Sequence, residues 1–273
     1  MEEKKEINET EPESKTADGK TANALRKKEY KVLNEETRSK SLTKKSSKTV
    51  KYIDMIVGKK GIFALLKYEL LTSCFASWPG ALGIALRSIF FKMLFKKVGR
   101  GVTFGKNLTI RHPHKISIGD YSIIDENCLL DAKGFSNNGI EIGKGCFLGR
   151  NSILSCKDGD IILGENVNIG FNCEIFSGST VKVGSNTLIA AYTYLISGDH
   201  AYDFIDKPIT EQEGKSIGVE VGANCWLGAK SMVLDGVKIG NDCVIGAAAV
   251  VNNDISPFSI AVGIPARVIK SRK

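Results

Sequence analysis

The chain has 273 residues, of which 42% are hydrophobic, and a formal net charge of +8 at pH 7. The length exceeds one average domain, and the hydrophobic fraction is ordinary for a globular protein. The basic excess is compatible with an anionic surface partner, whereas no basic patch interleaved with aromatic residues points to nucleic acid.

Residues 1–50 are rich in Lys, Glu, Ser and Thr and contain no Phe or Trp. A segment of this composition buries too little apolar surface to order itself. We therefore predict a disordered, charged arm that is dispensable for activity. The N-terminus also lacks the apolar stretch that follows the charges of a signal peptide, so we expect a cytoplasmic protein.

Residues 51–98 are strongly apolar. The longest run without a charge, residues 70–86, contains Pro79 and Gly80. A membrane span needs about 20 apolar residues, and proline interrupts helices, so we expect two or three helices packed on the next domain as a cap. The alternative is a segment at the inner face of the membrane, because basic residues follow the apolar stretch 89–95, as in interfacial helices.

A six-residue period runs through the remaining domain, residues 99–273, from about Ile118 to Val251. Its clearest stretch starts at Val221 and reads VGANCW, LGAKSM, VLDGVK, IGNDCV, IGAAAV, VNNDIS. Each block opens with an aliphatic residue, and the fifth position is small in most blocks. The fifth position lies two residues before the next first position, so both point to the same side of a strand. Hexapeptide periods of this kind predict a parallel β-helix.

The fourth position of the blocks tests this interpretation independently. It holds Asn, Gly or Asp in twelve of sixteen blocks, although these types make up 57 of the 273 residues. The blocks with Asn or Asp at this position include those of Asn127, Asn151, Asn172, Asn224 and Asp242. These residue types tolerate positive φ, so we predict a left-handed corner after each short strand.

Five of the seven cysteines occupy the small fifth position. Cys128 and Cys146 are 18 residues apart, as are Cys225 and Cys243. If three blocks make one turn, the members of each pair are stacked neighbours inside the helix. We interpret them as packing residues in a reducing compartment rather than as disulfides, and no Cys or His spacing indicates a metal site.

Two interruptions break the period. Residues 155–162 stretch one step and predict a corner loop. Between Leu195 and Val221, 26 residues replace a six-residue step, and this stretch includes an excursion loop at 199–218. The excursion carries His200, the only histidine outside residues 112–114. Long loops on rigid scaffolds commonly carry function, so His200 is the leading candidate for a functional residue.

The run SGDHAYD at 197–203, together with residues 219–270, resembles the hexapeptide-repeat acyltransferases. It is similar in particular to the maltose/galactoside and colanic-acid-type exopolysaccharide O-acetyltransferases, over about residues 100–271. The resemblance implies a left-handed β-helix, a homotrimer, and acetyl-CoA bound in clefts between neighbouring subunits.

The same resemblance assigns residues to the site. His200 would be the general base that takes the acceptor proton, a role suited to its ordinary pKa near 6.5. Asp199 and Asp203 are candidates to hold its other ring nitrogen, and Tyr202 and Asp203 would contact the acceptor. The residues implied for CoA are Trp226, Gly228, Ala229, Ala247 and Ala248 along the coils. From their positive charge, we expect Arg267 and Lys270 to pair with the CoA phosphates.

We therefore predict an O-acetyltransferase that moves an acetyl group from acetyl-CoA to a sugar hydroxyl, in surface-polysaccharide assembly. Two alternatives remain open. One is an N-acetyltransferase for an amino sugar or amino acid, because amines and alcohols use similar machinery. The other is a non-catalytic β-helix scaffold, against which the presence of His200 argues.

Overall fold

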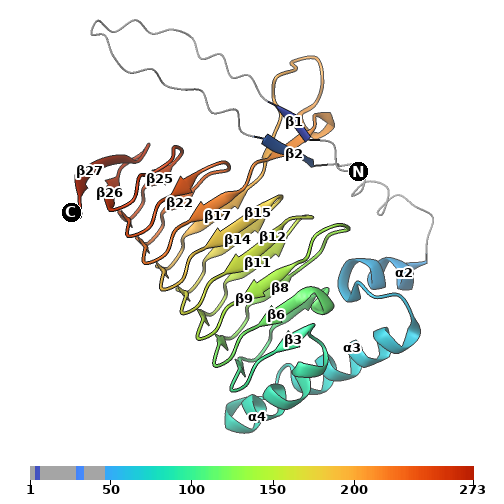
Figure 1. The fold of residues 1–273 in the computed structure, drawn as a ribbon. Helices are drawn as coiled ribbons and strands as arrows, with labels where there is room; N and C mark the ends of the chain where they lie inside the picture. Colours follow the sequence, from blue (N-terminus) through green and yellow to red (C-terminus); the bar gives the residue numbers. More distant parts are fainter. Residues whose placement is uncertain (1–3, 7–28, 34–46) are drawn as a thin grey trace, which may run out of the picture.

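The computed structural model describes residues 4–6, 29–33 and 47–273. The chain winds through three parallel sheets that form the faces of one β-helix, with helices packed at its N-terminal end (Figure 1). The predicted β-helix is therefore confirmed.

Successive strands pass from face 1 to face 2 to face 3 and back. Face 1 contains β3 (Lys97–Val98), β6 (Ile116–Ile118), β9 (Ile140–Ile142), β12 (Asp160–Leu163), β15 (Thr180–Val183), β20 (Val219–Val221) and β23 (Lys238–Ile239). Face 2 contains β4 (Thr103–Phe104), β7 (Ile123–Ile124), β10 (Phe147–Leu148), β13 (Asn168–Ile169), β16 (Leu188–Ile189), β21 (Trp226–Leu227), β24 (Val244–Ile245), β26 (Ser259–Val262) and the antiparallel β27 (Arg267–Ser271). Face 3 contains β5 (Thr109–Arg111), β8 (Leu129–Asp131), β11 (Ile153–Cys156), β14 (Glu174–Ser177), β17 (Tyr194–Ser197), β22 (Met232–Val233) and β25 (Val250–Val251).

The corners follow the predicted backbone geometry. Asn127, Asn151, Asn172, Asn224 and Asp242 all have positive φ, between 54° and 61°. The four blocks without Asn, Gly or Asp at position four adopt it as well, at Tyr121, Tyr192, Lys230 and Ala248. The stacked hydrogen bonds of the coil thus impose a left-handed residue even where the side chain disfavours it.

The interior contains the aliphatic first position and the small fifth position of the blocks. Ile124, Ile245 and Val251 are fully buried, as are Cys128 and Cys243. Trp226 pairs with Val244, so Cys225 and Cys243 lie in adjacent coils as predicted.

The other predicted cysteine pair is wrong. Leu129 pairs with Ile153, 24 residues later, which places Cys128 beside Ser152, and the Cys146 backbone N–H donates to Ser122 Oγ at 3.1 Å. The prediction assumed 18 residues per coil. That length holds between β21 and β24, but earlier coils are longer.

The extra residues collect at one corner, between face 3 and face 1, which we call the insertion corner. Residues 132–139, 157–159, 178–179 and 198–218 all connect a strand of face 3 to the next strand of face 1. The predicted corner loop within 155–162 is one of these connections. The excursion with His200 is the longest of the four.

Short helices over residues 48–93 pack at the N-terminal end of the β-helix, so the predicted helical segment is confirmed. They are α2 (Lys48–Tyr52), the π-helical η1 (Ile53–Val57), α3 (Ile62–Phe75), α4 (Gly80–Phe90) and the 3₁₀ helix η2 (Phe91–Met93). Tyr68 Oη donates to the Ile110 carbonyl at 2.7 Å, and Arg87 Nε donates to the Phe104 carbonyl at 2.9 Å. Both bonds fasten helices to the first coil. None of the helices in the described part of the chain combines the length and the hydrophobicity that a membrane span requires.

Most of the predicted disordered arm lies outside the described residues. Its described parts are residues 47–50, which begin α2, and the strands β1 (Lys4–Glu6) and β2 (Glu29–Leu33), which pair with each other antiparallel. Strand β2 also pairs with β19 (Gly214–Ser216) of the excursion, and β19 pairs with β18 (Asp199–His200). The β1–β2 pair lies beside the excursion in Figure 1.

Candidate active site

The excursion is a two-stranded hairpin that leaves the insertion corner. In its antiparallel ladder, Asp199 lies opposite Lys215 and His200 lies opposite Gly214. The Ala201 N–H continues the pairing by donating to the Glu213 carbonyl at 3.0 Å. His200 is thus held at a defined place in a strand rather than in an irregular loop.

Two polar side chains that the sequence reasoning missed hold the excursion in shape. The Gln212 side chain is buried, and its Nε2 donates to the carbonyls of Phe204 and Lys207 at 2.8 and 3.1 Å. The Asp235 carboxylate accepts from the N–H groups of Ile217 and Gly218, at 2.8 and 2.9 Å, where the chain returns to the coil. Burial nevertheless raises the pKa of Asp235. Neither role has a sequence signal, because both partners are backbone groups brought together by the fold.

His200 is exposed in the single chain. Asp199 Oδ1 accepts a hydrogen bond from the backbone N–H of His200 at 2.7 Å. Asp203 Oδ2 lies 3.5 Å from Lys215 Nζ. Among the described residues, neither ring nitrogen of His200 has a hydrogen-bond partner, so orientation of the ring by a carboxylate stays a prediction. Tyr202 is exposed on the same excursion.

The residues predicted for CoA gather at the other side of the β-helix. Trp226 lies on face 2 and is 51% exposed. Gly228 and Ala229 follow it at the corner between face 2 and face 3, and Ala247 and Ala248 occupy that corner in the next coil. The Ala248 N–H donates to the Ala229 carbonyl at 2.9 Å, so the two corners are stacked.

Gly228 has no room for a side chain at this stacked corner. A Cβ on Gly228 would lie 2.5 Å from the backbone nitrogen of Ala247. Arg267 and Lys270 are both exposed on β27, at the C-terminal end of face 2. The candidate CoA residues therefore share one face and its edge.

The structure thus separates the predicted site residues into two groups. Asp199, His200, Tyr202 and Asp203 lie on the excursion at the insertion corner, between faces 3 and 1. The candidate CoA residues lie on face 2 and at its corner with face 3. Two pockets, of about 300 and 150 Å³, are lined by residues of neither group.

The buried cysteines are unsuited to nucleophilic chemistry. Burial raises the pKa of Cys225 to about 11 and also raises the pKa of Cys243. A nucleophilic cysteine needs a depressed pKa and solvent access. Among the candidate residues of the excursion, His200 carries an exposed imidazole, the side-chain type that most often serves as a general base.

Two models of repeat families match the chain. Residues 218–253 match the bacterial transferase hexapeptide of six repeats, and residues 160–196 match the hexapeptide repeat of succinyl-transferase. Together with the coil geometry, these matches define a protein built of transferase-type hexapeptide repeats.

Curated relatives extend the match. Nodulation protein L of Rhizobium meliloti is 35% identical over 131 residues, which are 47% of this chain and 68% of the relative. A probable acetyltransferase of Mycobacterium tuberculosis is 35% identical over 49% of this chain and 45% of its own length. Galactoside O-acetyltransferase of Escherichia coli is 36% identical over 41% of this chain and 54% of its own length. The chain belongs to the hexapeptide-repeat acetyltransferase family, although it spans only about half the length of the last two relatives.

A solved structure shows the same fold. It is a mutant of an N-acyltransferase from Bacillus cereus, in complex with dTDP-4-amino-4,6-dideoxyglucose and coenzyme A. The likeness has a TM-score of 0.50 at 22% identity, and covers 68% of this chain and 89% of the other. At this identity the likeness supports the fold alone.

Proposed function

We propose that this protein transfers an acetyl group from acetyl-CoA to a hydroxyl group of a sugar, with His200 as the general base. The main support is the position of His200, exposed on a paired strand where the chain leaves a rigid coil. Membership of the acetyltransferase family supports the reaction class, and the galactoside enzyme among the relatives supports a sugar acceptor.

The chemistry needs one proton carrier. As the acceptor oxygen attacks the thioester carbonyl, His200 takes the hydroxyl proton and the new C–O bond forms. The C–S bond then breaks, and the imidazolium returns its proton to the CoA thiolate. A positioned base of this kind contributes roughly 10²–10⁴-fold to the rate. No acyl-enzyme is needed, in keeping with the buried cysteines.

The complete site is proposed to lie between two copies of the chain, within a homotrimer. The excursion of one copy would bring His200, with Tyr202 and Asp203 toward the acceptor, to face 2 of its neighbour. There Trp226 and the stacked small corner would border the pantetheine arm. Arg267 and Lys270 would pair with the CoA phosphates, because charge-assisted bonds to phosphate are strong.

The test measures release of free CoA thiol with a panel of sugars, for the full chain and for His200→Asn. We expect the variant to lose about 10²-fold or more in kcat, while its affinity for CoA and its melting temperature stay unchanged. Wild-type kcat in the purified variant would rule out the proposed base.

Mass spectrometry of the acetylated product separates O- from N-transfer. An acetyl ester is removed by mild alkaline hydroxylamine, whereas an amide survives. An acetylated product that resists this treatment would show that the acceptor group is an amine rather than a sugar hydroxyl. If no sugar in the panel is acetylated although the protein still binds CoA, the result would instead favour a non-catalytic scaffold.

A further inference from the structure

Helix α4 buries a charged side chain and exposes aliphatic ones, which is the reverse of the pattern expected for a helix on the surface of a soluble domain. Its buried residues are Gly83 and Arg87, while Leu82, Ile84 and Ile89 are exposed. Besides its bond to the first coil, the Arg87 guanidinium donates to the Trp78 carbonyl at 2.7 Å. The charged Arg87 side chain therefore points inward and donates to backbone carbonyls, whereas the aliphatic side chains face outward.

Helix α3 repeats this arrangement. Tyr68 and Leu71 are buried, whereas Phe63, Leu66 and Leu70 form an exposed stripe at spacing i, i+3, i+7. Phe63 is 85% exposed and Leu70 62% exposed. The two helices contact each other through the stacked rings of Phe75 and Phe90. We call the exposed set Phe63, Leu66, Leu70, Leu82 and Ile89 the outer face.

The outer face points away from the β-helix. The opposite sides of both helices make the bonds from Tyr68 to the Ile110 carbonyl and from Arg87 to the Phe104 carbonyl in the first coil. In Figure 1, α3 and α4 lie at the N-terminal end of the β-helix, and several coils separate them from the excursion. The outer face is thus separate from the proposed acetyl-transfer site.

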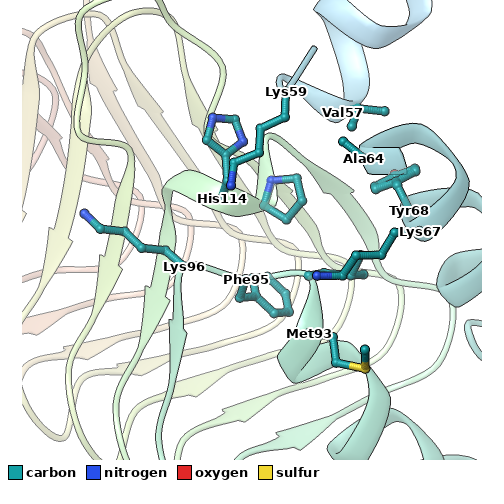
Figure 2. A pocket seen from close by; sticks show the side chains of 11 residues that line it. Val57, Lys59, Ala64, Lys67, Tyr68, Met93, Phe95, Lys96 and His114 are labelled. Atoms are coloured by element: carbon teal, nitrogen blue, oxygen red, sulfur yellow. The ribbon is translucent and has the colours of Figure 1, made fainter. Parts of the chain in front are cut away.

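Positive charge is concentrated on the same segment. Residues 47–100 contain ten Lys and Arg but only two Asp and Glu, an excess of eight that equals the net charge of the whole chain. Beside α3, a pocket of about 300 Å³ has an apolar wall that includes Tyr68 and Phe95. Figure 2 shows the side chains of Lys59, Lys67 and Lys96 around this pocket, and all three lysines are exposed.

We propose that the outer face of α3 and α4 binds the surface of an anionic lipid bilayer. Exposed Phe, Leu and Ile side chains enter the boundary between headgroups and acyl chains, and nearby lysines pair with lipid phosphates. Neither helix is long enough to span the bilayer, so attachment is peripheral. The segment then has two functions: its inner side caps the first coil, and its outer side contacts lipid.

Flotation of the full chain with vesicles tests this proposal. We expect binding to vesicles of equal parts phosphatidylcholine and phosphatidylglycerol, and much weaker binding to phosphatidylcholine alone or in high salt. Phe63→Ser/Leu70→Ser should lower the bound fraction roughly tenfold or more, because both side chains supply buried apolar area. Both residues are exposed, so the melting temperature should not change.

The chain offers a matched control outside the outer face. Phe135 is 77% exposed and Ile269 is 64% exposed, close to the values of Phe63 and Leu70. Phe135→Ser/Ile269→Ser should therefore float like the wild type. Equal losses in the two double variants would overturn the proposal, because general surface hydrophobicity would then explain the binding.

The lysines are tested separately by Lys59→Glu/Lys67→Glu, which should abolish the preference for anionic vesicles. The rival occupant is a second copy of this chain. Absence of flotation, together with a Phe63→Ser/Leu70→Ser variant of lower mass by light scattering, would contradict lipid binding and assign the outer face to self-association.

Discussion

Lys31 Nζ donates a hydrogen bond of 2.9 Å to the backbone carbonyl of Asp158, 127 residues further along the chain, and lies 3.4 Å from its carboxylate. Asp158 belongs to the insertion corner, two coils before the excursion. Strand β2 is thus joined to the β-helix by a side chain and to the excursion by its backbone. This arrangement changes the expectation that the whole N-terminal segment is dispensable.

Removal of β2 should lower activity. Strand β2 pairs with one edge of β19, and β18 with His200 pairs with the other edge. Deletion of residues 1–33 uncovers the first edge and should lower kcat about tenfold or more, because small misplacements of a catalytic group are costly. Deletion of residues 1–28 keeps β2 and serves as the control. Equal kcat in the two truncations would show that β2 does not position the excursion.

A charge in the interior of the β-helix should unfold it. Ile245 is completely buried on β24, so Ile245→Asp places an unpaired carboxylate in an apolar core at a cost of several kcal/mol. Val244→Asp, at the neighbouring half-buried position on the outside of the strand, should cost much less. Urea denaturation followed by circular dichroism compares them, and equal midpoints would show that the side-chain alternation is misassigned.

The thiols should divide sharply by accessibility. Cys74 is exposed, whereas the other six cysteines are buried. Burial raises the pKa of Cys128 to about 12, so this thiol is protonated as well as inaccessible at neutral pH. We expect a disulfide-exchange reagent to modify one thiol per native chain and all seven after denaturation. The native Cys74→Ser variant keeps only the six buried thiols, so its rapid modification would contradict this packing.

Acid should destabilise the N-terminal end through His114, a half-buried histidine. Burial, reinforced by His112 and Lys59, lowers the pKa of His114 to about 4, against an ordinary value of about 6.5 in the unfolded chain. The unfolded state therefore binds a proton between these values that the folded state does not. The contribution of His114 to stability is complete above pH 6.5, approximately, and is lost as the pH falls toward 4.

Paired denaturation curves isolate this effect. Between about pH 7 and pH 4.5, His114→Gln should lose less stability than the wild type, because its side chain does not titrate. His200→Gln replaces an exposed histidine and should follow the wild type. An identical loss in all three proteins would assign the acid sensitivity to other groups.

Local features of this protein could be predicted because they repeat. Each short strand followed by Asn or Asp at a left-handed corner is specified by six neighbouring residues, so the β-helix follows from the period. The same period makes an interruption easy to recognise in the sequence, so the excursion and its His200 could be predicted as well. The left-handed winding of the β-helix was predicted only from the family resemblance, because parallel crossover connections are right-handed in most other folds.

Relationships between distant residues were decided by the tertiary structure. Cys128 stacks beside Ser152 rather than Cys146, because extra residues loop out at the insertion corner and lengthen that coil to 24 residues. The pairing of β2 with β19 and the inward position of Arg87 have the same origin. The sequence period determines the path of each strand, but which residues become neighbours depends on coil length and on free backbone groups that only the assembled fold presents.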